Sequence, residues 1–115
     1  LLVVFSLPSY AQTEKKVLLK GEYGIDTYQV FYATGELKEE CTLVNGKRHG
    51  DYFFYAQDGQ LRIKTTYEYG KEHGLRQVFN TDNEIIALIH YVDDKKTKIT
   101  LPFTEFKEAV ARKNR

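Results

Sequence analysis

A unit of about 24 residues recurs through the middle of this chain, and it limits the fold more than any other feature. Residues 28–50 read YQVFYATGELKEECTLVNGKRHG, and residues 51–74 read DYFFYAQDGQLRIKTTYEYGKEHG. A third, weaker copy follows at 75–98. Because repeats of this length fold as similar units that contact mainly their neighbours, we predict one array of local contacts.

Each unit has the pattern of two strands around a turn. Along 37–44, one alternating set is Leu37, Glu39, Cys41 and Leu43, and the other is Lys38, Glu40, Thr42 and Val44, which predicts one apolar and one polar face. The turns at Gly35 and Gly59 require positive φ, which Asn83 supplies in the third copy. Residues 46–50 and 70–74 are expected as charged loops. We therefore predict a mainly β fold, an antiparallel β-hairpin repeat meander.

Both complete copies approximate a motif that runs roughly Tyr-x-x-x-Gly-x-Leu-Lys-x-Glu and then Asn-Gly-Lys-x-x-Gly, with one residue fewer between Tyr and Gly in the first copy. Its matching residues are Tyr32, Gly35, Leu37, Lys38, Glu40, Asn45, Gly46, Lys47 and Gly50 in the first copy, and Tyr55, Gly59, Leu61, Arg62, Gly70, Lys71 and Gly74 in the second. This motif resembles the MORN repeat, specifically the variant of YwqK-like proteins described as antitoxins. The resemblance covers residues 28–79 and implies a repeat fold and an antitoxin role. Two departures are Tyr or Phe at 52–54 in place of a frequent Trp, and a third copy without loop glycines.

The 115 residues favour one small domain with distinct ends. Residues 1–11, LLVVFSLPSYA, have the apolar run and small terminal residues of a signal peptide remnant, which predicts a periplasmic or extracellular protein. A buried N-terminal strand is the alternative, and a transmembrane helix is a weaker one, because a membrane span needs ~20 apolar residues. Residues 12–27 are expected as an N-terminal strand or partial repeat, before the repeats at 28–98.

The C-terminal segment 99–115 is expected to cap the array with a short helix. Residues 85–92 are apolar on both predicted faces, so a second element should cover Ile86 and Leu88. Phe103, Phe106 and Val110 have helical spacing, which predicts a helix over 104–111. Alternatively, Ile86 and Leu88 form a partner surface.

No pattern in the sequence favours catalysis, a metal or a cofactor. His49 and His73 would lie about 9.5 Å apart in equivalent loops, too far for one zinc ion unless both loops bend. Cys41 shares the phase of the apolar strand positions and should face the core as a small hydrophobic side chain. A net charge of +1 makes nucleic acid an unlikely partner.

These observations predict an exported, non-enzymatic module that binds another protein. The expected contact residues are Lys47, Arg48, His49, Tyr52, Lys71, His73 and Arg76, since aromatic and Arg side chains commonly anchor interfaces. An antitoxin or immunity protein is the alternative, and an envelope structural element a third. The basic tail, with Lys107, Arg112, Lys113 and Arg115, is either solvated or makes a weak contact with anionic lipid or an acidic protein.

Overall fold

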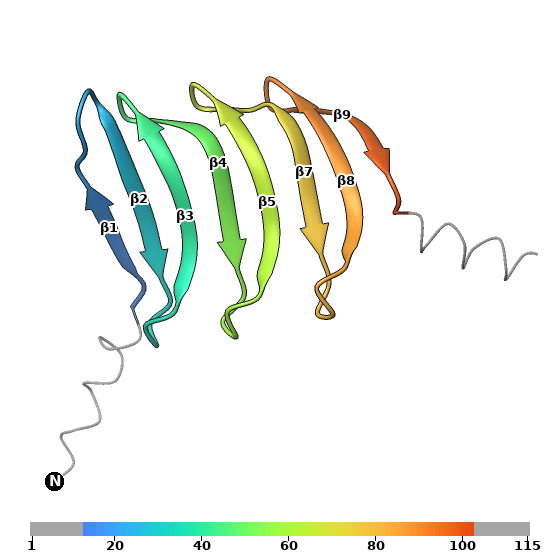
Figure 1. Ribbon diagram of the computed structural model, residues 1–115, viewed down its shortest axis with the longest axis horizontal. Helices are drawn as coiled ribbons and strands as arrows, with labels where there is room; N and C mark the ends of the chain where they lie inside the picture. Colours follow the sequence, from blue (N-terminus) through green and yellow to red (C-terminus); the bar gives the residue numbers. More distant parts are fainter. Residues whose placement is uncertain (1–12, 103–115) are drawn as a thin grey trace, which may run out of the picture.

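The computed structural model describes residues 13–102, which form one antiparallel sheet of nine strands (Figure 1). The strands are β1 (Lys15–Leu19), β2 (Ile25–Phe31), β3 (Leu37–Val44), β4 (Lys47–Tyr55), β5 (Leu61–Glu68), β6 (Lys71–Glu72), β7 (Gly74–Phe79), β8 (Ile85–Val92) and β9 (Lys95–Thr100). They follow one another across the sheet in chain order, except that the short β6 pairs only with β5. The predicted meander is confirmed.

The turns at the lower edge of the sheet in Figure 1 repeat one geometry. Gly35, Gly59 and Asn83 have φ of 109°, 92° and 65°. In each turn a backbone N–H donates to a carbonyl four residues ahead, from Tyr32 at 2.8 Å, and from Ala56 and Asn80 at 2.9 Å. Asn83 therefore replaces the turn glycine, as predicted.

A second row of turns lies along the opposite edge, and we call it the turn edge. It comprises Tyr23–Gly24, Asn45–Gly46, Tyr69–Gly70 and Asp93–Asp94, and both residues of each pair have positive φ, as in type I′ turns. Asp93–Asp94 thus keeps the backbone shape although the third copy has no glycine here. The expected charged loops are wrong, because most of their residues extend the strands: Lys47–Gly50 open β4, and Lys71–Glu72 form β6. A two-residue turn is enough to reverse the chain, so the charged residues that follow it can take part in strand pairing.

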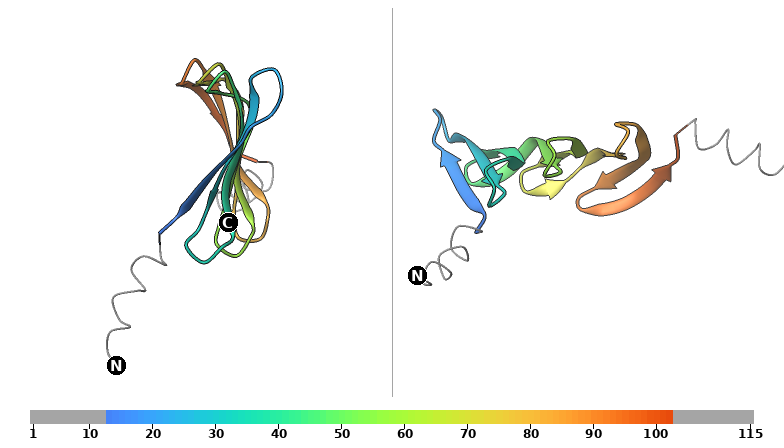
Figure 2. Two further views of the ribbon diagram at one scale, coloured as in Figure 1. Left: turned by 90° about the vertical axis from the view of Figure 1, so that its left-hand side faces the viewer. Right: turned by 90° about the horizontal axis from the view of Figure 1, so that it is seen from below.

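Burial is concentrated on one face of the sheet, which we call the inner face. The buried residues are Asp26, Val30, Cys41, Thr65, Glu72 and Tyr91. The strand register places them on the same side, because residues paired across neighbouring strands share a face. Cys41 pairs with Tyr52, which in turn pairs with Thr65. Val30 pairs with Glu39, which lies two residues before Cys41 and therefore on the same face. The expectation of an apolar face and a polar face is wrong in detail, since two carboxylates lie buried among the apolar residues. The twist of the sheet is visible in Figure 2.

The two ends of the sheet differ from the sequence-based expectation in one respect. A ninth strand, β9, pairs along the edge of β8, with Ile89 opposite Ile99. The predicted helix over 104–111 and the signal peptide remnant at 1–11 both fall outside residues 13–102, so they stay predictions. Within 13–102 there is no helix long and apolar enough to cross a membrane.

Candidate functional site

Arg48 occupies the centre of a polar cluster on the inner face. Its guanidinium carbon lies 5.1 Å from the ring centre of Tyr52 and 5.4 Å from that of Tyr67. Its Nη1 donates to the Tyr67 hydroxyl at 3.4 Å, and the Tyr52 hydroxyl donates to Glu39 at 2.9 Å. These contacts hold Arg48 in place between two aromatic rings, although part of its side chain is exposed.

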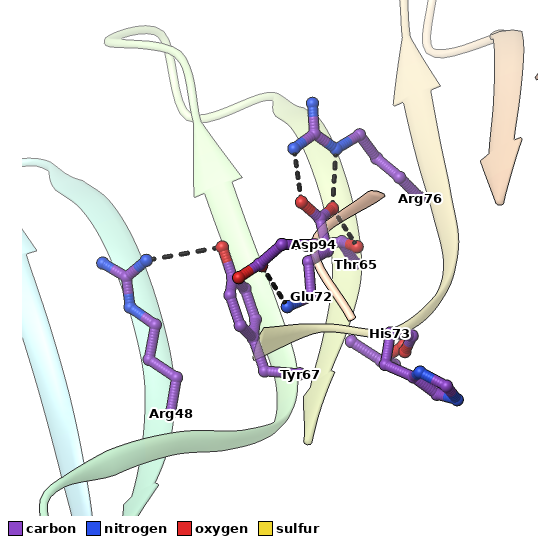
Figure 3. A network of polar contacts seen from close by, with 8 residues as sticks. Arg48, Thr65, Tyr67, Glu72, His73, Arg76 and Asp94 are labelled. Atoms are coloured by element: carbon purple, nitrogen blue, oxygen red, sulfur yellow. Dashed lines mark hydrogen bonds and ion pairs between the residues drawn. The ribbon is translucent and has the colours of Figure 1, made fainter. Parts of the chain in front are cut away.

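A second cluster surrounds the buried carboxylate of Glu72 (Figure 3). The Thr65 hydroxyl donates to it at 2.7 Å, and Arg76 donates through Nε and Nη2, each at 2.8 Å. The Glu72 backbone N–H donates to the Asp94 carboxylate at 2.7 Å. The guanidinium of Arg76 also lies 4.8 Å from the ring centre of Tyr91. Glu72 therefore joins β5, β6, β7 and the last turn of the turn edge.

The protonation states of these clusters follow from their surroundings. The hydrogen bonds from Arg76 to Glu72 raise the pKa of Arg76, so the guanidinium stays charged. Burial and the hydrogen bond to Glu39 raise the pKa of Tyr52, so the phenol stays neutral. Burial also raises the pKa of Cys41, which keeps this inner-face thiol protonated at neutral pH.

The turn edge carries a third cluster, centred on Tyr69. The His49 ring lies 4.3 Å from the Tyr69 ring, and its Nδ1 accepts the Tyr69 backbone N–H at 3.1 Å. The side chain of Lys47 passes close to Gly70, 3.7 Å from where a Cβ would stand. Tyr69 is 65% exposed, and its φ of 45° is uncommon for a bulky residue. An exposed ring is thus fixed at the turn tip, with Lys47 near the adjoining Gly70 and Lys71 two residues further along the chain.

The same arrangement recurs one repeat later with different chemistry. Nδ1 of His73 accepts the Asp93 backbone N–H at 3.4 Å, and it lies 3.7 Å from the Asp93 carboxylate. An acidic side chain therefore replaces the aromatic one at the turn tip. In both repeats the histidine holds the following turn to the sheet.

The structure divides the seven predicted contact residues into two groups. Arg48, Tyr52 and Arg76 lie in the inner-face clusters, whereas Lys47, His49, Lys71 and His73 lie along the turn edge. Tyr69 was not predicted. Its signal in the sequence is the large aromatic residue at a turn position where the neighbouring copies have Asn45 and Asp93.

The histidines do not gather with other ligand residues. Across residues 13–102, no group of three or more His, Cys, Asp or Glu side chains is placed to hold a metal ion. What the described surface offers is a rigid edge of aromatic, basic and acidic side chains.

Comparison with known families supports the repeat interpretation. Residues 27–45 and 48–69 match the family model of the MORN repeat variant. The predicted MORN-type repeat is thereby confirmed for these two segments, and it indicates a repeat-containing module for binding proteins. Searches of curated proteins and of solved structures found no match. The finer resemblance to YwqK-like antitoxins stays a prediction.

Proposed function

We propose that this chain with MORN-type repeats is an exported, non-enzymatic module that binds another protein through the turn edge. The observation that carries the proposal is the geometry of Tyr69. Its ring is exposed and held by His49, and the turn that carries it lies beside Lys47 and leads into Lys71. Interfaces are typically anchored by a few such aromatic and cationic side chains.

The backbone of Tyr69 adds a second argument. A left-handed conformation costs roughly 1–2 kcal/mol for most residues, whereas Asn and Gly adopt it readily. Asn45 occupies the equivalent turn position one repeat earlier. A sequence selected only for stability would favour Asn at position 69 as well, and strained residues of this kind cluster at functional sites.

The residues of the inner-face clusters also hold the backbone of the turn edge in place. The Gly70 N–H donates to the Arg48 carbonyl at 2.7 Å, and the Asp94 N–H donates to the Glu72 carbonyl at 2.8 Å. Arg48 and Glu72 are themselves fixed by their side-chain contacts. A partner that binds the turns would therefore meet a preorganised surface and would lose little affinity to the ordering of loops.

Site-specific photo-crosslinking in the native host would test the proposal. A benzophenone amino acid replaces Tyr69 at the turn edge, and as a matched control it replaces Asp58 at the opposite edge, where the side chain is also exposed. We expect one discrete protein adduct from position 69 and none from position 58. The proposal would be wrong if both positions gave the same adducts, or if Lys47→Glu with Lys71→Glu left the adduct from position 69 unchanged.

Export and the identity of the partner need separate experiments. A fusion of the chain, with residues 1–11 in place, to a phosphatase that is active only outside the cytoplasm should be active, and an inactive fusion would contradict export. The narrower proposal that the partner is a toxin rests on the YwqK-like resemblance. Growth rescue when the chain is co-expressed with a toxin encoded beside it would support this role, and a lack of rescue would oppose it.

A further inference from the structure

Among the residues that the structure describes, β9 is the last strand of the sheet and its outer edge is unpaired. One side of β9 pairs with β8 from Lys95 to Thr100, and no strand among residues 13–102 pairs with its other side. The backbone N–H and C=O groups along such an edge can pair with a strand from another chain. This edge of β9 lies at one end of the array, whereas the turn edge runs along the top of the whole array in Figure 1.

Positive charge is concentrated at this end of the chain. Lys95, Lys96 and Lys98 are all exposed on β9. Residues 95–115 contain seven Lys or Arg and two Glu, a net charge of +5, whereas residues 1–94 contain ten basic and fourteen acidic residues, a net charge of −4. The two parts together give the +1 of the whole chain. A partner strand with acidic side chains would therefore be attracted to β9.

The register of β9 shows which side chains a new strand would meet. Ile99 pairs with Ile89 and lies on the inner face, while Lys98 pairs with His90 and lies on the outer face. A register shift at His90/Tyr91 places Lys96 opposite Tyr91 on the inner face and Lys95 opposite Val92 on the outer face. Ile99 is 54% exposed, and Leu101, just beyond the strand, is 58% exposed. An added strand with alternating side chains could therefore place acidic residues beside Lys95 and Lys98 and an aliphatic residue beside Ile99.

Charge argues against the segments of this chain as occupants of the edge. A second copy pairing through its own β9 would bring like charges together, and β1 carries Lys15 and Lys16. The segment 103–115 has four basic and two acidic residues and is itself positive. Lysines on edge strands commonly prevent pairing between copies of one protein.

We infer that the outer edge of β9 binds an extended acidic segment of another protein, which adds to the sheet as a further strand. Main-chain hydrogen bonds would supply the pairing, and Lys95 and Lys98 on the outer face would select the acidic sequence. This inference is independent of the turn edge, because it uses a different set of residues and a different end of the sheet.

A synthetic peptide can test the inference on the full chain. The probe is a fluorescent peptide of roughly eight alternating Glu and Val residues, long enough for one ordinary strand. We expect an increase in fluorescence anisotropy that salt weakens, together with slower amide hydrogen exchange along β9. Charge reversal by Lys95→Glu with Lys98→Glu should weaken the affinity by about tenfold or more, which corresponds to at least about 1.4 kcal/mol.

Two matched controls distinguish strand addition from general attraction. Lys15→Glu with Lys16→Glu changes the opposite edge by the same charge and should leave the affinity unchanged. The same peptide with alternate backbone nitrogens methylated keeps its charge but loses donors, and it should not bind. The inference would be overturned if both charge reversals lowered the affinity equally, or if the methylated peptide bound as tightly as the unmethylated one. It would also be overturned if the unmethylated peptide did not bind. None of these outcomes would bear on Tyr69 and the turn edge.

Discussion

His49 is joined to Tyr69 twice, through a ring contact of 4.3 Å and through a hydrogen bond of 3.1 Å from the Tyr69 backbone N–H to Nδ1. The two residues belong to consecutive repeats, so the pair links one hairpin to the next. The hydrogen bond requires the Nδ1 atom to be unprotonated, because a protonated nitrogen cannot accept. His49 thus has a structural role that also sets the orientation of the proposed contact residue.

Replacing Tyr69 should separate stability from binding. Asn adopts positive φ more easily than Tyr, so Tyr69→Asn should raise the free energy of unfolding by about 0.5–1 kcal/mol. The exchange in the other direction, Asn45→Tyr at the equivalent turn, should lower it by a similar amount. Urea unfolding measures both changes. A loss of stability in Tyr69→Asn would show that the ring contact with His49 outweighs the backbone strain.

Removing the Glu72 carboxylate should destabilise the centre of the sheet. Glu72 is 6% exposed and accepts hydrogen bonds from Thr65 and Arg76. Breaking a buried pair by removing one partner costs about 3–5 kcal/mol, and the partial exposure of Arg76 reduces this to about 2–3 kcal/mol for Glu72→Ala. Glu68→Ala, an exposed position at the end of β5, is the control and should change stability by less than about 0.5 kcal/mol. Equal effects of the two variants in urea unfolding would contradict the central role of Glu72.

Alkaline pH should destabilise the protein partly through Tyr52. Burial and the hydrogen bond to Glu39 raise the pKa of Tyr52 in the folded state. The unfolded state therefore loses this proton first, and the contribution to stability, fully present below the ordinary tyrosine pKa of about 10, falls as pH rises above it. Urea midpoints measured at several pH values should fall less steeply for Tyr52→Phe than for the wild type. Parallel pH profiles for Tyr52→Phe and the wild type would show that folding does not raise the pKa of Tyr52.

Cys41 should report on unfolding. The residue is 4% exposed, and burial raises the pKa of its thiol, so both access and reactivity are low in the folded state. We expect labelling by a thiol reagent to be slow in buffer and to accelerate through the urea transition that fluorescence or circular dichroism detects. Labelling in buffer as fast as in denaturant would place the thiol at the surface.

The sequence predicted the parts of this fold that repeat. Gly35, Gly59 and Asn83 specify the same turn because few residues tolerate its backbone, and the alternation along β3 correctly placed Cys41 on the buried side. The two glycines of residues 46–50 predict a loop, whereas Gly50 has positive φ inside β4. The strand β9 was missed because Lys-rich residues favour strands only weakly.

The site was harder to predict than the fold. Arg48, Tyr52 and Arg76 are predicted as contact residues, but their packing against aromatic rings and carboxylates depends on which strands become neighbours across the sheet. Position 48 is Arg where the next repeat has Glu72, so the contacts of one copy could not be transferred to the other. Tyr69 differs from Asn45 and Asp93 in the sequence, yet only the turn geometry shows that this difference carries strain.

The hydrogen bonds from Gly70 to Arg48 and from Asp94 to Glu72 have a consequence for how such a chain can evolve. Each of these two turns is attached to the preceding hairpin through a backbone N–H and a backbone C=O, groups that every residue type except proline possesses. A whole hairpin could be duplicated or deleted in the gene while its neighbours kept the same attachments. The length of the turn edge offered to a partner can therefore change in steps of one repeat, and no new hydrophobic core is required.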